Sequence, residues 1–352
     1  MRDGKTQLLT RNLGHTYGAM STYPYRNVEV AWIRPDVDRE VLRACTRRSD
    51  LKGLFHSIGV LAILAASGWI TYHFYSTGQW GWMALALYVH GGLFAFRPQV
   101  HELSHNTVFR TRWLNRFFAR VFGLVHWTSN HARYWMSHKY HHRYTLHKES
   151  EAERVLPRAQ TFSVVLLRAI HVVDLTGFLT ALYDAVLLVF VPFRRNSRRS
   201  VWERYVYDQA TDSERRDAYL THLYQFGFHI GFAIVAIATG NWFLVVLVTL
   251  SQWYGGRWYH TLVHDTMHVG REPESDDFRK SCRSVRVDPF TSFMYWHMEW
   301  HTEHHTFAAV PCYNLRRFHA LTREHWEEPQ TLFQAWREIA RSSYELLAIA
   351  SS

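Results

Sequence analysis

The sequence predicts an all-α membrane protein with four transmembrane helices arranged as two hairpins. The first observation is a pair of long apolar runs at about 54–76 and 80–100, repeated by a second pair at about 219–239 and 242–259. Runs of about 20 apolar residues are long enough to cross the hydrocarbon core of a bilayer. The second observation is that each pair is joined by a short turn without charged residues. The third is that 24 of the 352 residues are histidine, and many lie near the ends of these runs.

Residues 1–50 are predicted to form a cytosolic arm ahead of the first run. The arm is polar and rich in arginine, and it lacks the apolar stretch that a cleavable signal peptide contains. Pro24 and Pro35 break regular structure, and a short helix is expected at 36–48 with Asp36 as its N-cap.

The charges around the runs predict the orientation of the two hairpins. Basic residues flank the runs on the side opposite the uncharged turns: Arg47, Arg48, Lys52, Arg110, Arg112, Arg194, Arg195, Arg198 and Arg199. Because cytoplasmic loops carry an excess of lysine and arginine, both termini and the 101–218 loop are expected in the cytosol. The expected location is an integral, multi-pass position in a membrane, most simply a bacterial inner membrane.

The remaining segments are expected to complete one membrane domain over 51–327. Between the hairpins, 162–192 is apolar but carries charged residues at helical spacing, which predicts an amphipathic helix lying in the membrane interface. Residues 101–218 and 260–327 are expected to form a cytosolic helical cap. A C-terminal helix is expected within 328–352, over about 328–347.

Composition excludes several other classes of protein. The net charge of +10 fits either nucleic acid or anionic lipid headgroups, and the placement of the charge beside apolar runs favours lipid over nucleic acid. The three cysteines, Cys45, Cys282 and Cys312, are far apart and form no CxxC pair, so a disulfide framework or a cysteine-ligated cluster is not supported.

The histidines recur in a pattern that predicts metal binding. Between His297 and His305, four of nine residues are histidine, and His301, His304 and His305 share one face of a helix. The segment 138–142 repeats this spacing with His138, His141 and His142. His101 and His105 stand at i and i+4 where the second run ends, and His260, His264 and His268 follow the fourth. Two copies of one spacing indicate one composite site.

The number of imidazoles predicts more than one metal ion. Neutral imidazole suits zinc, copper, iron and nickel, and a tetrahedral zinc site is saturated by three or four ligands. Eight or more histidines therefore indicate two metals, and two irons that react with oxygen are the chemically useful choice. The Glu-x-x-His pair of carboxylate-bridged di-iron bundles is missing at the required spacing.

These motifs resemble a known family. HELSH at 101–105, HKYHH at 138–142 and HTEHH at 301–305, in this order between apolar hairpins, resemble the three histidine boxes of the integral-membrane fatty acid desaturase and hydroxylase superfamily. The resemblance implies a four-span bundle whose cytosolic cap holds two irons, and oxygen-dependent attack on an acyl chain. The implied ligands are His101, His105, His138, His141, His142, His268, His301, His304 and His305. His264 would hold a water near the second iron or bind it directly, and His260 is expected to pack.

Four residues are expected to support the ligands. Glu102, Asp265 and Glu303 can each accept the far N–H of a ligating imidazole and fix its tautomer. His297 stands in His297-Met298-Glu299-Trp300, where many relatives carry Asn-Met-x-Tyr, and either orients a ligand or lies on the cap surface. His126, His131 and His147 are expected to pack.

The predicted function is an oxygen-dependent, non-haem di-iron oxidoreductase acting on an unactivated C–H bond, foremost a fatty acid or lipid desaturase. A hydroxylase and an oxidative decarboxylase that forms a terminal alkene are alternatives on the same scaffold. Alternatives from other classes are a histidine-rich metal transporter and a four-span scaffold with structural zinc.

An external electron donor is expected: a ferredoxin, a rubredoxin-like protein or a cytochrome system. The sequence lacks a haem-binding HPGG motif, a CxxC pair and a dinucleotide-binding GxGxxG motif. The sequence also predicts a basic surface, which includes Arg110, Arg112, Arg116, Arg120 and the run 194–199. This surface could dock an acidic electron donor or attract lipid headgroups, and both interpretations stay open.

Overall fold

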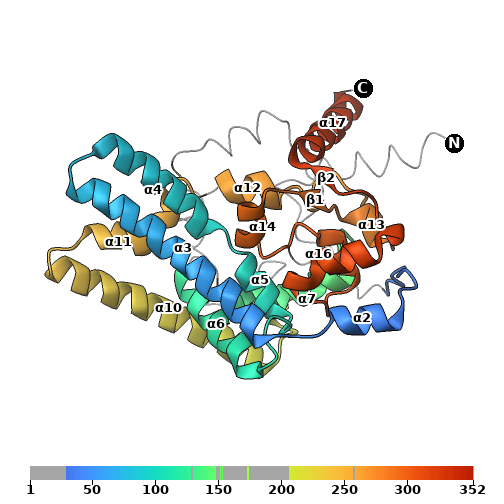
Figure 1. The fold of residues 1–352 in the computed structure, drawn as a ribbon, viewed down its shortest axis with the longest axis horizontal. Helices are drawn as coiled ribbons and strands as arrows, with labels where there is room; N and C mark the ends of the chain where they lie inside the picture. The colour runs from blue at the N-terminus through green and yellow to red at the C-terminus, as the bar shows by residue number, and fades with distance from the viewer. Residues whose placement is uncertain are drawn as a thin grey trace.

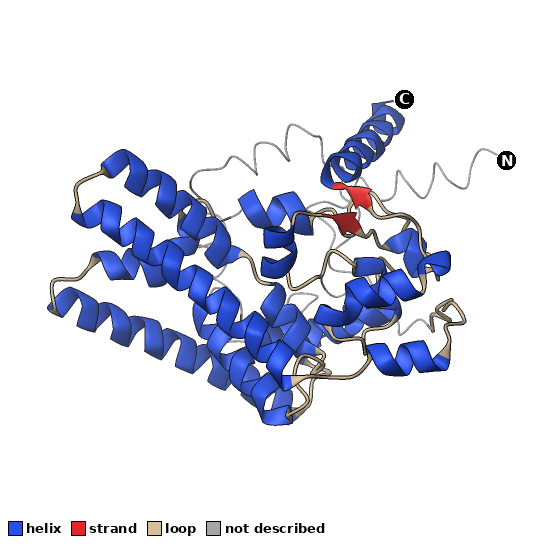
Figure 2. Ribbon diagram, in the orientation of Figure 1, coloured by secondary structure: helices blue, strands red, loops and turns tan. Residues whose placement is uncertain are grey.

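The computed structural model describes residues 29–127, 130–147, 206–256 and 258–351, together with the isolated residues 151, 153 and 173. This part of the chain is mostly helical, as Figure 2 shows, which agrees with the predicted class. One small parallel sheet pairs β1 (Val285–Arg286) with β2 (Gln330–Thr331). The helices α3 (Asp50–Ser76), α4 (Trp80–Ala95) and α10 (Asp212–Ala238) extend toward the same side of the molecule (Figure 1).

The first predicted hairpin is present as two neighbouring helices, α3 (Asp50–Ser76) and α4 (Trp80–Ala95). Ser49 begins α3 by accepting a hydrogen bond from the Lys52 backbone, and Gly78 turns the chain with φ of 71°. The second run differs from the prediction, because α4 ends at Ala95 and α5 (Pro98–Ser104) begins beyond an extended residue.

Within the described part of the chain, two helices are long and apolar enough to cross a membrane: α3 and α10 (Asp212–Ala238). Large apolar side chains on both face outward; Trp69 of α3 is 69% exposed and Ile234 of α10 is 63% exposed. Exposed apolar surface of this kind fits contact with lipid rather than water. The four-span topology stays a prediction.

The fourth run is not the continuous helix predicted for 242–259. It is divided into α11 (Phe243–Val248), a 3₁₀ turn η4 (Ser251–Trp253) and α12 (Trp258–His264). The physical reason is close backbone packing: Gly255 takes a φ of 75°, and a Cβ added to Gly91 of α4 would lie 1.9 Å from the Tyr254 carbonyl oxygen. Only glycine admits this approach.

The other described elements complete the fold. They are α2 (Arg39–Cys45), α6 (Arg112–Val125), α7 (His131–Tyr144), α13 (Phe278–Ser281), α14 (Pro289–Met294), α15 (His301–Thr306), α16 (Cys312–Leu321), the 3₁₀ turn η5 (Arg323–His325) and α17 (Leu332–Ser351). The N-cap of α2 is Asp38 rather than the predicted Asp36. The interfacial helix predicted at 162–192 lies outside the described residues, apart from Val173, and so does the basic run 194–199.

A buried core joins the long helices to the shorter ones. Trp296 is fully buried and meets Phe122 of α6 edge to face, with ring centroids 5.6 Å apart. Phe96, at the break between α4 and α5, stacks on Tyr295 at 4.9 Å. Aromatic pairs of this geometry contribute about 0.5–1.5 kcal/mol beyond their buried area. The break after α4 is therefore fixed by packing.

The contact at Gly91 makes a testable prediction. Gly91→Ala should lower the free energy of unfolding by about 1–3 kcal/mol, because the methyl group would push against the backbone of the η4 segment. Gly81→Ala on the same helix is the control, since an added Cβ there meets nothing within 4 Å. Thermal unfolding in one detergent measures both variants, and equal melting temperatures would contradict the account.

Candidate metal centre

Four separate segments bring the predicted histidines together. His101 lies on α5, whose first turn begins with Pro98, and His105 caps the end of that helix. His138, His141 and His142 lie on α7, whose N-cap is Asn130. His301, His304 and His305 lie on α15. His268 follows α12 in a turn.

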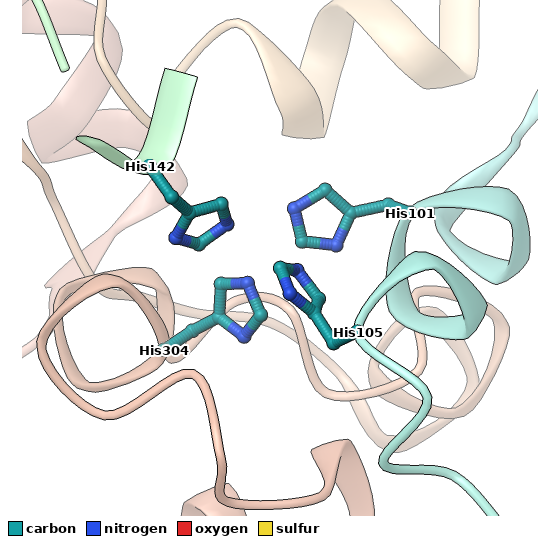
Figure 3. Close-up of side chains that lie close together, drawn as sticks. All are labelled: His101, His105, His142 and His304. Carbon is teal, nitrogen blue, oxygen red and sulfur yellow. The ribbon is translucent and has the colours of Figure 1, made fainter. Parts of the chain in front are cut away.

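The histidines form two groups of four. The first histidine group is His101, His105, His142 and His304, whose rings converge from three helices in Figure 3. The second histidine group is His141, His268, His301 and His305, and all four are buried. Within each group the possible ligand nitrogens lie within 4.8 Å of one another. The groups adjoin, because the rings of His142 and His305 stack with centroids 4.2 Å apart.

Carboxylates orient several of these rings. Glu102 is fully buried, and one of its oxygens lies 3.1 Å from His101 Nδ1 and 3.4 Å from His304 Nδ1. In the second group, Glu151 lies 2.9 Å from His141 Nδ1. Such partners fix which ring nitrogen carries the proton and leave the other lone pair free for a metal.

Two further rings are held by neutral oxygens. The Ser281 carbonyl accepts from His268 Nδ1 at 3.0 Å. Thr145 donates its hydroxyl proton to the His141 carbonyl, so its oxygen accepts from His305 Nδ1 at 3.1 Å. Both arrangements turn the Nε2 atoms of His268 and His305 toward the second group.

Several buried ring nitrogens have no hydrogen-bond partner among the described residues. Within the two groups they are His101 Nε2, both nitrogens of His142, His301 Nδ1, both nitrogens of His304 and His305 Nε2. An unsatisfied buried polar atom costs about 1–3 kcal/mol, so this set is unfavourable by itself. His268 Nε2 and His301 Nε2 also face each other at 2.8 Å. The donor set fits transition-metal ions, which take up such lone pairs.

Electrostatics keeps most of these rings neutral. Burial, reinforced by neighbouring imidazoles, lowers the pKa of His101, His301 and His304 well below the usual range. Neutral imidazole is the form that binds metal. His141 differs: burial opposes its charge, but Glu151 and then Glu153 raise its pKa to about 9.

The structure places His138 beside the first group and His264 apart from both. His138 Nε2 lies 3.2 Å from His105 Nε2, while Glu153 holds its Nδ1 at 2.7 Å. His264 instead has its Nδ1 2.9 Å from the Tyr295 hydroxyl. Of these two, only His138 shares the arrangement of His101 and His141, with Nδ1 held by a carboxylate.

Two of the predicted supporting residues have other partners. Glu303 accepts from His319 Nδ1 and, at 2.6 Å, from the Ser284 hydroxyl, so it does not orient a grouped histidine. The Glu303 side chain lies on a different face of α15 from His301, His304 and His305. His297 lies in a left-handed turn with φ of 58°, and its Nδ1 contacts the Ser292 hydroxyl at 2.9 Å.

Two acids that hold histidines of α7 are not among the predicted residues. Glu151 and Glu153 follow the histidines of 138–142 in a stretch where every second residue is acidic, and this pattern is the only sequence signal for them. Asp265, which was predicted, is partly buried, and its charge adds to burial and to Glu299 in raising the pKa of the Tyr295 hydroxyl. Its role in orienting a ligand stays a prediction.

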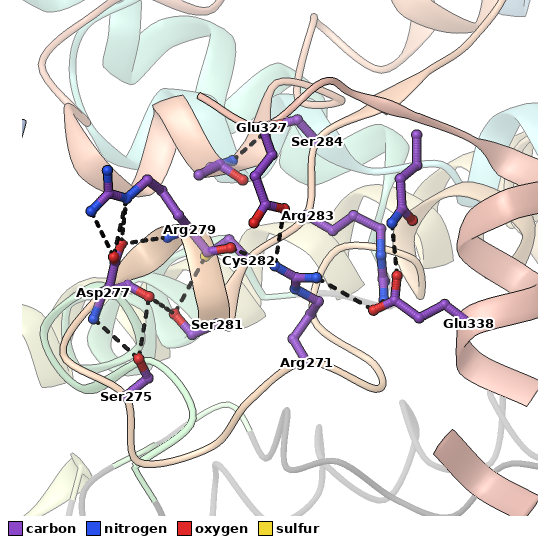
Figure 4. Close-up of polar contacts among 12 residues, drawn as sticks. Arg271, Ser275, Asp277, Arg279, Ser281, Cys282, Arg283, Ser284, Glu327 and Glu338 are labelled. Atoms are coloured by element: carbon purple, nitrogen blue, oxygen red, sulfur yellow. Dashed lines mark hydrogen bonds and ion pairs between the residues drawn. The ribbon is translucent and has the colours of Figure 1, made fainter. Parts of the chain in front are cut away.

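A cluster of arginines fixes the turn that carries His268. The buried Arg283 donates to the Val269 carbonyl at 3.1 Å and to Glu338 at 2.8 Å, and Arg271 reaches the same carboxylate at 3.3 Å (Figure 4). Arg279 forms a forked ion pair with Asp277. These bonds tie the turn to α13 and α17, so that the Ser281 carbonyl stays beside His268.

A small pocket of about 130 Å³ reaches the edge of the first group at His101. Its walls combine apolar side chains with polar ones: Phe96, Arg97, Pro98, Val100, Tyr134, Glu153, His260, His264, Tyr295 and Met298. It connects the surroundings of the histidine groups with the break between α4 and α5.

The long apolar helices and the two histidine groups together define a histidine-rich membrane protein. The chain belongs to the fatty acid desaturase family, whose model matches residues 80–336, and this match confirms the resemblance seen in the sequence. The family indicates an oxidoreductase that acts on fatty acids. Comparison with curated proteins finds no match.

The position of Glu102 makes a second prediction. Glu102→Gln should weaken metal binding about 10–100-fold, because an amide in this position can turn its NH₂ group toward the hydrogen-bonded His101 ring and the neighbouring His304 ring, which a carboxylate oxygen otherwise orients. Glu303→Gln is the matched control, since this carboxylate meets His319 and Ser284 instead. Chelator competition on the two purified variants measures the affinity. An equal loss in both would show that Glu102 has no special position.

Proposed function

We propose that this protein is a membrane-bound, oxygen-dependent desaturase of fatty acyl chains with one iron in each histidine group. The observation that carries the proposal is the pair of adjoining groups of four imidazoles inside the segment that matches the family. Bound iron would supply the activation of dioxygen and the removal of hydrogen from an unactivated C–H bond.

The residues of the chain would hold and shield this chemistry. The imidazoles would bind the ions, Glu102 and Glu151 would orient two of the rings, and burial of the second group would exclude water.

The pocket beside His101 is the proposed place for the reacting part of the acyl chain. Phe96, Val100 and Met298 offer an apolar wall, and the pocket borders the first histidine group. The substrate would approach from the lipid, with the spans crossing the membrane and the histidine groups on the cytosolic side. An external donor, of the ferredoxin, rubredoxin-like or cytochrome type, would supply the electrons.

The placement of the histidines disfavours metal transport. A transporter needs polar ligands along a path near mid-membrane. The eight grouped histidines instead lie on α5, α7, α15 and the turn after α12, and none lies on α3 or α10. Desaturation, hydroxylation and oxidative decarboxylation all use the same site, and the product distinguishes them.

Lipid analysis tests the reaction. Cells that express the protein should contain acyl chains that have lost two hydrogens, and cells that express His304→Ala should not. His325→Ala is the control, because this histidine lies in η5 outside both groups. Mass spectrometry of total lipids reads the result. Gain of one oxygen atom would identify a hydroxylase, and loss of carbon dioxide with a terminal alkene would identify a decarboxylase. No histidine-dependent change would overturn lipid chemistry.

Metal analysis tests the centre itself. Protein from iron-supplied cells should contain about two irons per chain, since eight imidazoles exceed the needs of one ion. His142→Ala and His305→Ala, which alter one group each, should lower the iron content, and His325→Ala should not. Elemental mass spectrometry measures the content. Zinc alone, in protein made with ample iron, would contradict the proposal.

A further inference from the structure

A groove of about 640 Å³ lies between α6, α7 and α10, apart from the histidine groups. Its floor includes the apolar side chains of Met136, Leu220 and Leu223, and Arg116 and Arg120 of α6 also line it. The groove therefore offers a cationic end and an apolar surface to one ligand.

The helix α6 has three distinct faces. Phe118 and Phe122 are buried in the core. Arg112, Arg116 and Arg120 recur every four residues and form a second face, where all three are exposed. Trp113 and Phe117 form a third face beside the arginines, and they are 63% and 48% exposed. Exposed aromatic residues beside arginines are typical of a helix that lies in the membrane interface.

The groove lies at the height expected for lipid headgroups. Its α10 residues come from the first turns of that helix, which is a candidate membrane span. Tyr219 and Leu220, which begin the outward apolar surface of α10, are 43% and 45% exposed. If α10 crosses the bilayer, the groove opens where the hydrocarbon begins.

The charges in the groove leave two cations for a ligand. Arg116 and Arg120 have no hydrogen bond or ion pair among the described residues, whereas Glu214 is paired with Lys139 at 2.8 Å. Asp217 adds one exposed carboxylate. The lining therefore carries a net positive charge where α6 borders the groove, and this charge suits a phosphate group.

We propose that this groove binds a membrane phospholipid, with its phosphodiester between Arg116 and Arg120 and one acyl chain along Met136, Leu220 and Leu223. The apolar lining beside two arginines, at the start of a candidate membrane span, favours this occupant over an acidic electron donor, because a phospholipid carries a phosphate and an apolar chain in one molecule. The inference rests on the membrane placement in the proposed function and not on the chemistry of the histidine groups.

Lipid retention by the intact protein tests the proposal. Native mass spectrometry of detergent-purified protein would compare dioleoylphosphatidylglycerol with dioleoylglycerol, which has the same chains and no phosphate. The phospholipid should be retained and the diacylglycerol lost. Arg116→Gln with Arg120→Gln should weaken phospholipid retention about tenfold or more, because two charge-assisted contacts disappear. Arg316→Gln with Arg317→Gln, two exposed arginines on α16, is the matched control and should behave as the unaltered protein.

Three results would overturn the proposal. The first is that both double variants retain the phospholipid equally. The second is that the protein retains the phospholipid and the diacylglycerol equally. The third is that the Arg116 and Arg120 variant retains lipid normally but is reduced more slowly by an external donor. The last result would assign the face to the donor. Iron content, measured on the same samples, separates failure of this inference from failure of the proposed function, because the groove contains none of the eight grouped histidines.

Discussion

Buried imidazole nitrogens that lack protein partners are the constraint on which the rest of this structure depends. Polar atoms removed from water are ordinarily hydrogen-bonded, and each exception has a free-energy cost. Among the described residues, seven such nitrogens lie on histidine rings from α5, α7 and α15, beside the turn after α12. The surrounding fold has to hold these segments together against that cost. The arginine cluster around Glu338 and the aromatic packing at Phe96 both serve this purpose.

Helical periodicity allowed part of the site to be predicted from sequence. The i, i+3, i+4 spacing places His301, His304 and His305 on one face of a helix, and the structure brings all three into the two groups. The same spacing on α7 does not distinguish His138, which lies beside the groups, from His141 and His142 within them. Whether a histidine belongs to one of the two groups depends on where other segments of the chain pack against its helix. Helical spacing in the sequence does not contain this tertiary contact.

The carboxylates show the same limit more clearly. Glu102 and Glu303 both stand next to histidines in sequence, yet only Glu102 meets grouped rings. Glu303 turns to His319, which is sixteen residues away on α16. The fourth apolar run resembles one span because hydropathy ignores backbone conformation, whereas Gly255 and the close approach at Gly91 divide it. Hydropathy identifies the apolar run, but it does not predict how closely two backbones approach each other.

The adjacent pairs His141–His142 and His304–His305 are each divided between the two groups. Neighbouring Cα atoms are about 3.8 Å apart across a trans peptide, and this length does not vary. Two helices thus act as rulers between the groups. Ions held by the two groups would therefore be linked through one peptide unit of α7 and one of α15. A movement of either helix would act on both groups together.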